Sequence, residues 1–137
     1  NHEMAVLAKK TQEGQKELFV ERTKMTGEIF SKASDKLIDF TKTDEYTQRL
    51  CNSAKAIAEL FGDRDCVLYV NERDLGAAEG IKALFGGSTE VRADKTIKIG
   101  GIRGYCASMG IIADETLDSK LEAQREWFVE NAALSVL

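Results

Sequence analysis

The side chains with the greatest chemical reactivity in this 137-residue chain are three cysteines and one histidine. Cys51, Cys66 and Cys106 are widely spaced and form no Cys-x-x-Cys pair, and His2 lies at the start of the chain. Zinc sites need clustered ligands, and disulfide frameworks need an even number of cysteines. A nucleophilic Cys106 would need a base beside it, for which His2 is poorly placed. We therefore expect buried, reduced thiols, no metal site and no cofactor.

The glycine-rich stretch Gly100-Gly101-x-x-Gly104 could in principle bind a phosphate. A nucleotide cradle places such glycines between a strand and a helix N-terminus, where backbone N–H groups face the phosphate. Here the glycines lead into another expected strand, so a close chain crossing or a bulge is the better interpretation. The alternative is a small enzyme or ligand-binding α/β domain that uses Cys106 and the 100–110 glycine loop, with an apolar pocket beside it.

Acidic residues recur every four positions near the end of the chain. The series is Asp114, Asp118, Glu122, Glu126 and Glu130. On a helix this spacing produces one ridge of similar carboxylates, whereas general acid–base chemistry needs two carboxylates in different environments. We assign no catalytic residue. The ridge is either a solvated face or a surface that docks a basic partner, with Asp118, Glu122, Glu126 and Glu130 as its docking residues.

The distribution of charge excludes several classes of partner. Net charge is −4, and residues 114–137 alone hold six acids against two bases. A nucleic-acid binder needs a basic surface, and membrane spanning needs about 20 apolar residues. The sequence has neither. The chain opens with Asn-His-Glu instead of Met inside an expected helix, so we expect the natural helix to begin further upstream.

A long helix is predicted from residue 4 to about residue 40, where Glu, Lys, Gln and Ala predominate. Leu7, Leu18, Ile29 and Phe40 recur at intervals of 11, and Gly14 and Met25 are also 11 apart. An 11-residue repeat favours a right-handed supercoil. The predicted partner-helix face consists of Leu7, Gly14, Leu18, Met25 and Ile29. Two interpretations stay open at this point: the helix pairs with a partner helix, or it folds back on its own domain.

The rest of the chain reads as an α+β domain with the order α-β-α-β-β-β-α and a mixed sheet of about four strands. A capped helix is expected from residue 43 or 44 to Phe61, and a buried strand over 66–70. A helix from Asn71 or Asp74 to Phe85 and a strand over 89–93 would complete a parallel pair. Strands near 101–107 and 110–114 form a tight hairpin, and a last helix starts near Asp114–Thr116.

The hairpin and the last helix resemble the C-terminal signature of the E-type peripheral-stalk subunits of V-type and archaeal-type rotary ATPases. The matching residues run from Gly100-Gly101-Ile102-Arg103-Gly104 to Ile111-Ile112-Ala113-Asp114-Glu115-Thr116-Leu117 and on to Leu121 and Glu122. Leu68-Tyr69-Val70 and Ile81-Lys82-Ala83-Leu84-Phe85-Gly86 resemble the preceding strand–helix unit. The chain departs from the pattern at Gly76, Gly80 and Cys106.

The resemblance implies a function that spacing alone does not give. Residues 1–42 would be a stalk helix that forms a right-handed coiled coil with a small helical partner of the G type, and residues 43–137 would be a globular domain docked on the catalytic head. Such a protein is a non-catalytic stator, cytoplasmic and peripheral to the membrane, without direct membrane insertion. In isolation we expect the stalk helix either to fray or to self-associate through the same face, and a homodimeric coiled-coil adaptor is a further alternative.

Overall fold

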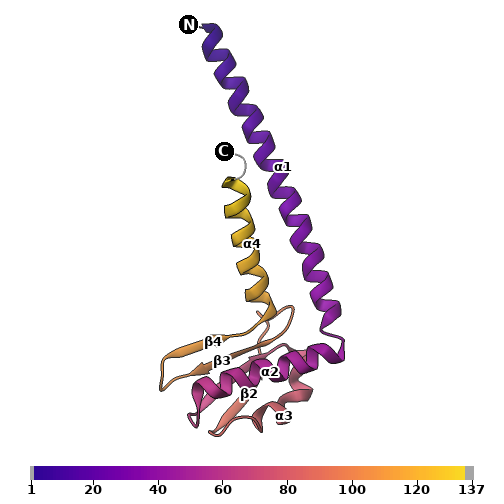
Figure 1. Ribbon diagram of the computed structural model, residues 1–137, viewed down its shortest axis with the longest axis vertical. Helices are drawn as coiled ribbons and strands as arrows, with labels where there is room; N and C mark the ends of the chain where they lie inside the picture. The colour runs from indigo at the N-terminus through magenta and orange to yellow at the C-terminus, as the bar shows by residue number, and fades with distance from the viewer. Residues whose placement is uncertain (1, 135–137) are drawn as a thin grey trace.

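In the computed structural model, which describes residues 2–134, the chain adopts a mixed α+β fold with four α-helices and one four-stranded sheet. Side chains are described for residues 13–131 except 15, 18 and 19. Helix α1 (His2–Phe40) rises from a compact part that holds the sheet and the shorter helices (Figure 1). The predicted element order after residue 43 is confirmed.

Helix α2 (Asp44–Phe61) begins and ends where the sequence predicts. The Thr43 hydroxyl accepts a hydrogen bond from the Tyr46 amide at 3.3 Å and so caps the helix. Gly62 ends it with a φ of 63°, which glycine adopts without steric penalty. The buried side of α2 consists of Tyr46, Leu50, Ala54, Ile57 and Phe61.

The sheet has the strand order β2-β1-β3-β4. Strand β1 (Cys66–Val70) is parallel to β2 (Thr89–Ala93) and antiparallel to β3 (Ile102–Cys106). Strand β3 also pairs antiparallel with β4 (Ile111–Asp114). Both the parallel pair and the hairpin confirm predictions from the sequence.

One face of the sheet packs against α2. Alternate residues of β1 and β3 are buried on this face. A Cβ atom at Gly104 would lie 2.9 Å from side-chain atoms of Ile57 and Phe61. Glycine at this position therefore lets α2 approach β3 closely. The other face exposes Tyr105 and Ile112.

The segment between β1 and β2 is less helical than the sequence predicts. In place of one helix reaching Phe85, it has a 3-10 helix, η1 (Glu72–Ala77), followed by the short helix α3 (Ala78–Lys82). Gly76 and Gly80 lie within these turns, and each costs about 1 kcal/mol relative to alanine inside an α-helix. Their low helix propensity explains why a longer helix does not form.

Helix α4 (Leu117–Leu134) leaves the hairpin and runs beside the C-terminal half of α1 (Figure 1). The rings of Phe30 and Phe128 meet edge to face, with centroids 5.8 Å apart and planes at 67°. Such aromatic pairs contribute beyond the area they bury. The predicted start near Asp114–Thr116 is close to the observed one. No helix among the described residues has both the length and the apolar character needed to cross a membrane.

Candidate interaction surfaces

One face of α1 is packed within the chain. Its half-buried residues recur at helical spacing and comprise Thr26, Gly27, Phe30, Ala33, Ser34, Leu37 and Ile38. Phe30 contacts α4 through Phe128, while Leu37 and Ile38 pack against the buried core of the domain. Thus the C-terminal half of α1 is attached to its own domain along this inner face.

The predicted partner-helix face of α1, called the outer seam here, lies elsewhere on the helix. It consists of Leu7, Gly14, Leu18, Met25 and Ile29. The side chains of Met25 and Ile29 are 55% and 50% exposed. Successive helix residues are about 100° apart, so Ile29 is turned away from Phe30. It lies one turn from Thr26 and Ala33, so the outer seam borders one edge of the inner face. The side chains of the two leucines lie outside the described residues.

Over its described side chains, helix α1 therefore has a packed inner face and, bordering it, exposed apolar surface at Met25 and Ile29. The inner face packs on α4 and the domain, as the second interpretation of the sequence expects. The outer seam stays exposed over its described residues, as pairing with another helix requires. A Cβ atom at Gly14 would have no atom within 4 Å. No described part of the chain therefore approaches Gly14 closely enough to require glycine at this position.

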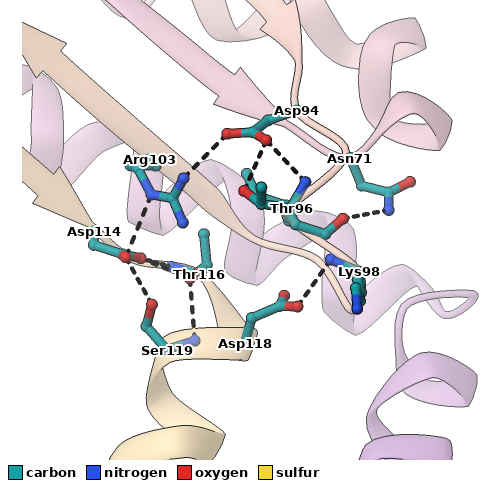
Figure 2. A network of polar contacts seen from close by, with 10 residues as sticks. Asn71, Asp94, Thr96, Lys98, Arg103, Asp114, Thr116, Asp118 and Ser119 are labelled. Carbon is teal, nitrogen blue, oxygen red and sulfur yellow. Dashed lines mark hydrogen bonds and ion pairs between the residues drawn. The ribbon is translucent and has the colours of Figure 1, made fainter.

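Asp118 differs from Glu122, Glu126 and Glu130 because its carboxylate is bound within the chain. Its oxygens accept hydrogen bonds from the backbone amides of Lys98, Ile99 and Gly100, at 2.8 to 3.1 Å. Charge-assisted bonds of this kind are stronger than neutral ones. Asp118 therefore joins the 98–100 loop to the first turn of α4 (Figure 2). Glu122, Glu126 and Glu130 are exposed on the same helix.

Asp114, the first acid of the series, ends β4 and belongs to a polar network (Figure 2). Arg103 bridges it to Asp94, with N–O distances of 3.4 and 3.1 Å. The hydroxyls of Thr116 and Ser119 donate to Asp114 at 2.6 and 2.7 Å. The network ties the hairpin, the loop after β2 and the start of α4 together.

The pKa values of Asp114 and Asp94 reflect these bonds. Burial raises the pKa of Asp114, but the hydrogen bonds from Ser119 and Thr116 and the charge of Arg103 hold it below its ordinary value. Hydrogen bonds from Thr96, helped by Arg103, lower the pKa of Asp94. Both groups are therefore stabilised as carboxylates, which suits a structural network.

The buried side chain of Tyr46 also binds the loop that Asp118 holds, through Gly101. The Tyr46 hydroxyl donates to Asp74 Oδ2 at 2.6 Å and accepts from the Gly101 amide at 2.8 Å. Burial, reinforced by the Asp74 carboxylate, raises the pKa of Tyr46 to about 12. No signal in the sequence indicates this link, because Tyr46 and Gly101 are 55 residues apart.

The glycines at 100 and 101 mark a close chain crossing, as interpreted from the sequence. Gly101 has a φ of 91°, and a Cβ atom there would lie 2.7 Å from the Glu115 carbonyl oxygen. The amides of residues 98–101 all donate to Asp118 or Tyr46. The N–H groups that a phosphate cradle would need are therefore engaged within the protein.

The enzyme alternative expects a base beside Cys106 and an apolar pocket beside the 100–110 loop, and the described residues do not bring these features together. Cys106 has Ser108 as its polar neighbour, with Sγ and Oγ 3.4 Å apart, whereas His2 lies at the far end of α1. Two hollows on the described surface are lined by residues of α2 and the 84–86 turn, and by residues 13–24 of α1. Neither hollow lies beside the 100–110 loop. No group of described side chains is arranged to hold a metal ion.

Comparison with protein-family models gave no match, and comparison with curated proteins gave none either.

Proposed function

We propose that this chain is a non-catalytic peripheral-stalk subunit of a V-type or archaeal-type rotary ATPase, similar to the C-terminal part of the E-type stalk proteins. It links the catalytic head to the membrane sector and resists rotation, so that ATP turnover stays coupled to proton or sodium transport. It works on the cytoplasmic side, at the membrane periphery. Its role is mechanical: it needs a stiff helix and two docking surfaces, and no reactive group.

The exposed outer seam of α1 is the observation that carries this proposal. Met25 and Ile29 leave apolar surface in water on a helix whose inner face is already packed. Burying such surface is worth about 25 cal/mol per Å². A second helix with a matching 11-residue repeat would cover the seam without disturbing α4. The occupant is a small helical stalk protein of the G type.

Bracing by α4 supports the mechanical part of the proposal. An isolated helix depends on packing for most of its stability, and a stalk must transmit torque without bending at its base. The Phe30–Phe128 contact and the core contacts of Leu37 hold the lower part of α1 against the domain. The exposed acids Glu122, Glu126 and Glu130 of α4 are the candidate surface for docking on the head.

A mixing experiment with matched variants tests the proposal. The chain is combined with a G-type stalk protein, and the mass of the complex is measured by size-exclusion chromatography with light scattering. We expect a one-to-one complex that Ile29→Glu abolishes. Val20→Glu is the control, because Val20 is 60% exposed but nine residues, or two and a half turns, from Ile29, on the opposite side of α1.

The two variants separate the proposed seam from general effects on the helix. Both introduce the same charge at an exposed apolar position of α1. Circular dichroism should show that both retain the folded domain. Equal loss of binding in the two variants, or a complex that forms normally with Ile29→Glu, would contradict the proposed seam. Absence of any complex with the unmodified chain would contradict the stalk function itself.

A further inference from the structure

Two of the three cysteines lie opposite each other on adjacent strands of the sheet. Strands β1 and β3 are antiparallel, and their register pairs Val67 with Tyr105 and Leu68 with Gly104. One position further along, the same register sets Cys66, the first residue of β1, opposite Cys106, the last residue of β3. Both side chains are buried in the same core cluster, at 6% and 0% exposure.

The backbone hydrogen bonds show which kind of antiparallel pair this is. The Cys66 amide donates to the Ser88 carbonyl at 3.0 Å, on the β2 side of the strand. The N–H and C=O of a strand residue point to the same side, so Cys66 makes no backbone bond toward β3. The two cysteines therefore form a non-hydrogen-bonded pair, whose Cα atoms are typically about 4.5 Å apart. Disulfides span Cα separations of about 4.4–6.8 Å.

We propose that Cys66 and Cys106 are a redox-active thiol pair that peroxide converts to an internal disulfide. Each thiol has another polar neighbour in the reduced structure: Thr89 Oγ1 lies 3.7 Å from Cys66 Sγ, and Ser108 Oγ lies 3.4 Å from Cys106 Sγ. Formation of the bridge requires the two side chains to turn from these hydroxyls toward each other, with the register of the strands unchanged.

The chemistry is balanced with hydrogen peroxide as the oxidant. The Cys106 thiolate attacks peroxide, which gives a sulfenic acid and hydroxide; the Cys66 thiol then displaces water from the sulfenic sulfur. Two thiols and one peroxide thus yield one disulfide and two waters. Cys106 is the attacking residue because its sulfur lies 3.4 Å from Ser108 Oγ, and a hydrogen bond from this hydroxyl would stabilise the thiolate.

The local electrostatics agree with this order of events. The hydrogen bond with Ser108 lowers the pKa of the Cys106 thiol, whereas burial raises the pKa of the Cys66 thiol. The thiolate is the nucleophile, so the cysteine with the greater thiolate character, Cys106, is oxidised first. The bridge would tie β1 to β3 and close a loop that contains α3 and β2, which restricts the unfolded chain.

Thiol counting on the intact chain tests the proposal. The full chain is treated with hydrogen peroxide, its remaining thiols are alkylated under denaturing conditions, and peptides are mapped by mass spectrometry. We expect loss of two of the three thiols, a Cys66–Cys106 peptide, and a higher thermal midpoint that a reductant reverses. Cys51→Ser should behave in the same way, because Cys51 lies on α2 and outside the pair.

Single-cysteine variants complete the test. Cys66→Ser should retain a Cys106 sulfenic acid, trapped by dimedone, and Cys106→Ser should react with peroxide several-fold more slowly. The wild-type peptide map decides the question even if these variants fold poorly. Disulfides that involve Cys51, linkage only between chains, or three unreacted thiols in the folded protein at peroxide levels that oxidise the urea-unfolded chain would overturn the proposal.

Discussion

Two side chains from distant parts of the sequence fasten the 98–101 loop. Asp118, at the start of α4, accepts hydrogen bonds from the three consecutive amides of residues 98–100. The Tyr46 hydroxyl accepts from the Gly101 amide and donates to Asp74. The loop joins β2 to β3, so these bonds fix where α4 leaves the domain and how it meets α1. At the scale of single residues, these hydrogen bonds thus connect the 98–101 loop to the start of the helix that packs on α1.

Asp118→Ala should lower the free energy of unfolding by about 1–3 kcal/mol, because it leaves partly buried amides without an acceptor. Urea denaturation measures this change. Glu122→Ala on the same helix is the control: its side chain is exposed, so its effect should stay within about 0.5 kcal/mol. Equal effects of the two substitutions would mean that Asp118 does not hold the loop.

Tyr46 gives the protein a distinctive alkaline pH dependence. Tyrosine in the unfolded chain ionises near its ordinary pKa of about 10, whereas the pKa of Tyr46 in the folded protein is raised to about 12. Between these values the unfolded state binds fewer protons, so stability is complete below pH 10 and falls as the pH rises toward 12. The difference in pKa corresponds to a loss of roughly 2–3 kcal/mol.

Tyr46→Phe should remove this part of the pH dependence, although the variant is less stable at neutral pH because Asp74 loses its hydrogen-bond donor. Unfolding midpoints measured from pH 8 to 12 test the point. Tyr105→Phe, at an exposed position on the open face of the sheet, should retain the wild-type slope. A Tyr46→Phe slope identical to that of the wild type would contradict the assigned link.

At the scale of elements, the packing of α4 against α1 is the contact that braces the long helix. Phe128→Ala removes the ring that meets Phe30 and should destabilise the helix pair by about 1–2 kcal/mol, close to the range for aromatic pairs. Hydrogen exchange at residues 26–34 should become faster while α2 is unaffected. Trp127→Ala is the matched control, since the Trp127 side chain is 62% exposed. Faster exchange at residues 26–34 in the Trp127 variant alone would mean that Trp127, and not Phe128, holds α4 against α1.

The acidic residues of α4 provide the second prediction for an element. If Glu122 and Glu126 dock on the catalytic head, their replacement by lysine should weaken binding of the head, and more so at low salt. Exposed charges are screened beyond about 10 Å at 0.1 M ionic strength. Reversal of exposed Glu59 on α2 is the control. Unchanged dissociation constants measured at two salt concentrations would identify the ridge as a solvated face.

Local signals predicted the elements well where each element is defined by its own residues. Thr43 and Gly62 delimit α2, and the alternation of β1 and β3 marks the core face of the sheet. The sequence did not predict that α4 packs on α1, because Phe30 and Phe128 are distant in the chain and neither helix has a wide apolar face. It also did not distinguish Asp118 from Glu122, because both have the same four-residue spacing in the series. Only the folded structure shows that the 98–100 loop binds Asp118.

At the scale of the whole molecule, α1 is braced at its base by a compact domain (Figure 1) and has a packed inner face and exposed apolar surface at Met25 and Ile29. The inner face belongs to the chain itself, and the outer seam is proposed for a partner. Gly14 and Gly27 together weaken the helix by about 2 kcal/mol. The upper part of α1 should therefore depend on a partner for its stability, whereas the part beside α4 should not.

Hydrogen exchange along α1, with and without a G-type stalk protein, is the decisive test of this dependence on a partner. In the isolated chain at low concentration, amides of residues 13–25 should exchange much faster than those of α2, and residues 26–40 should be intermediate. Addition of the partner should extend protection through residues 13–25 and leave α2 unchanged. Strong protection of residues 13–25 in the isolated monomer, independent of concentration, or no change on adding the partner, would show that the outer seam is not a partner-binding face.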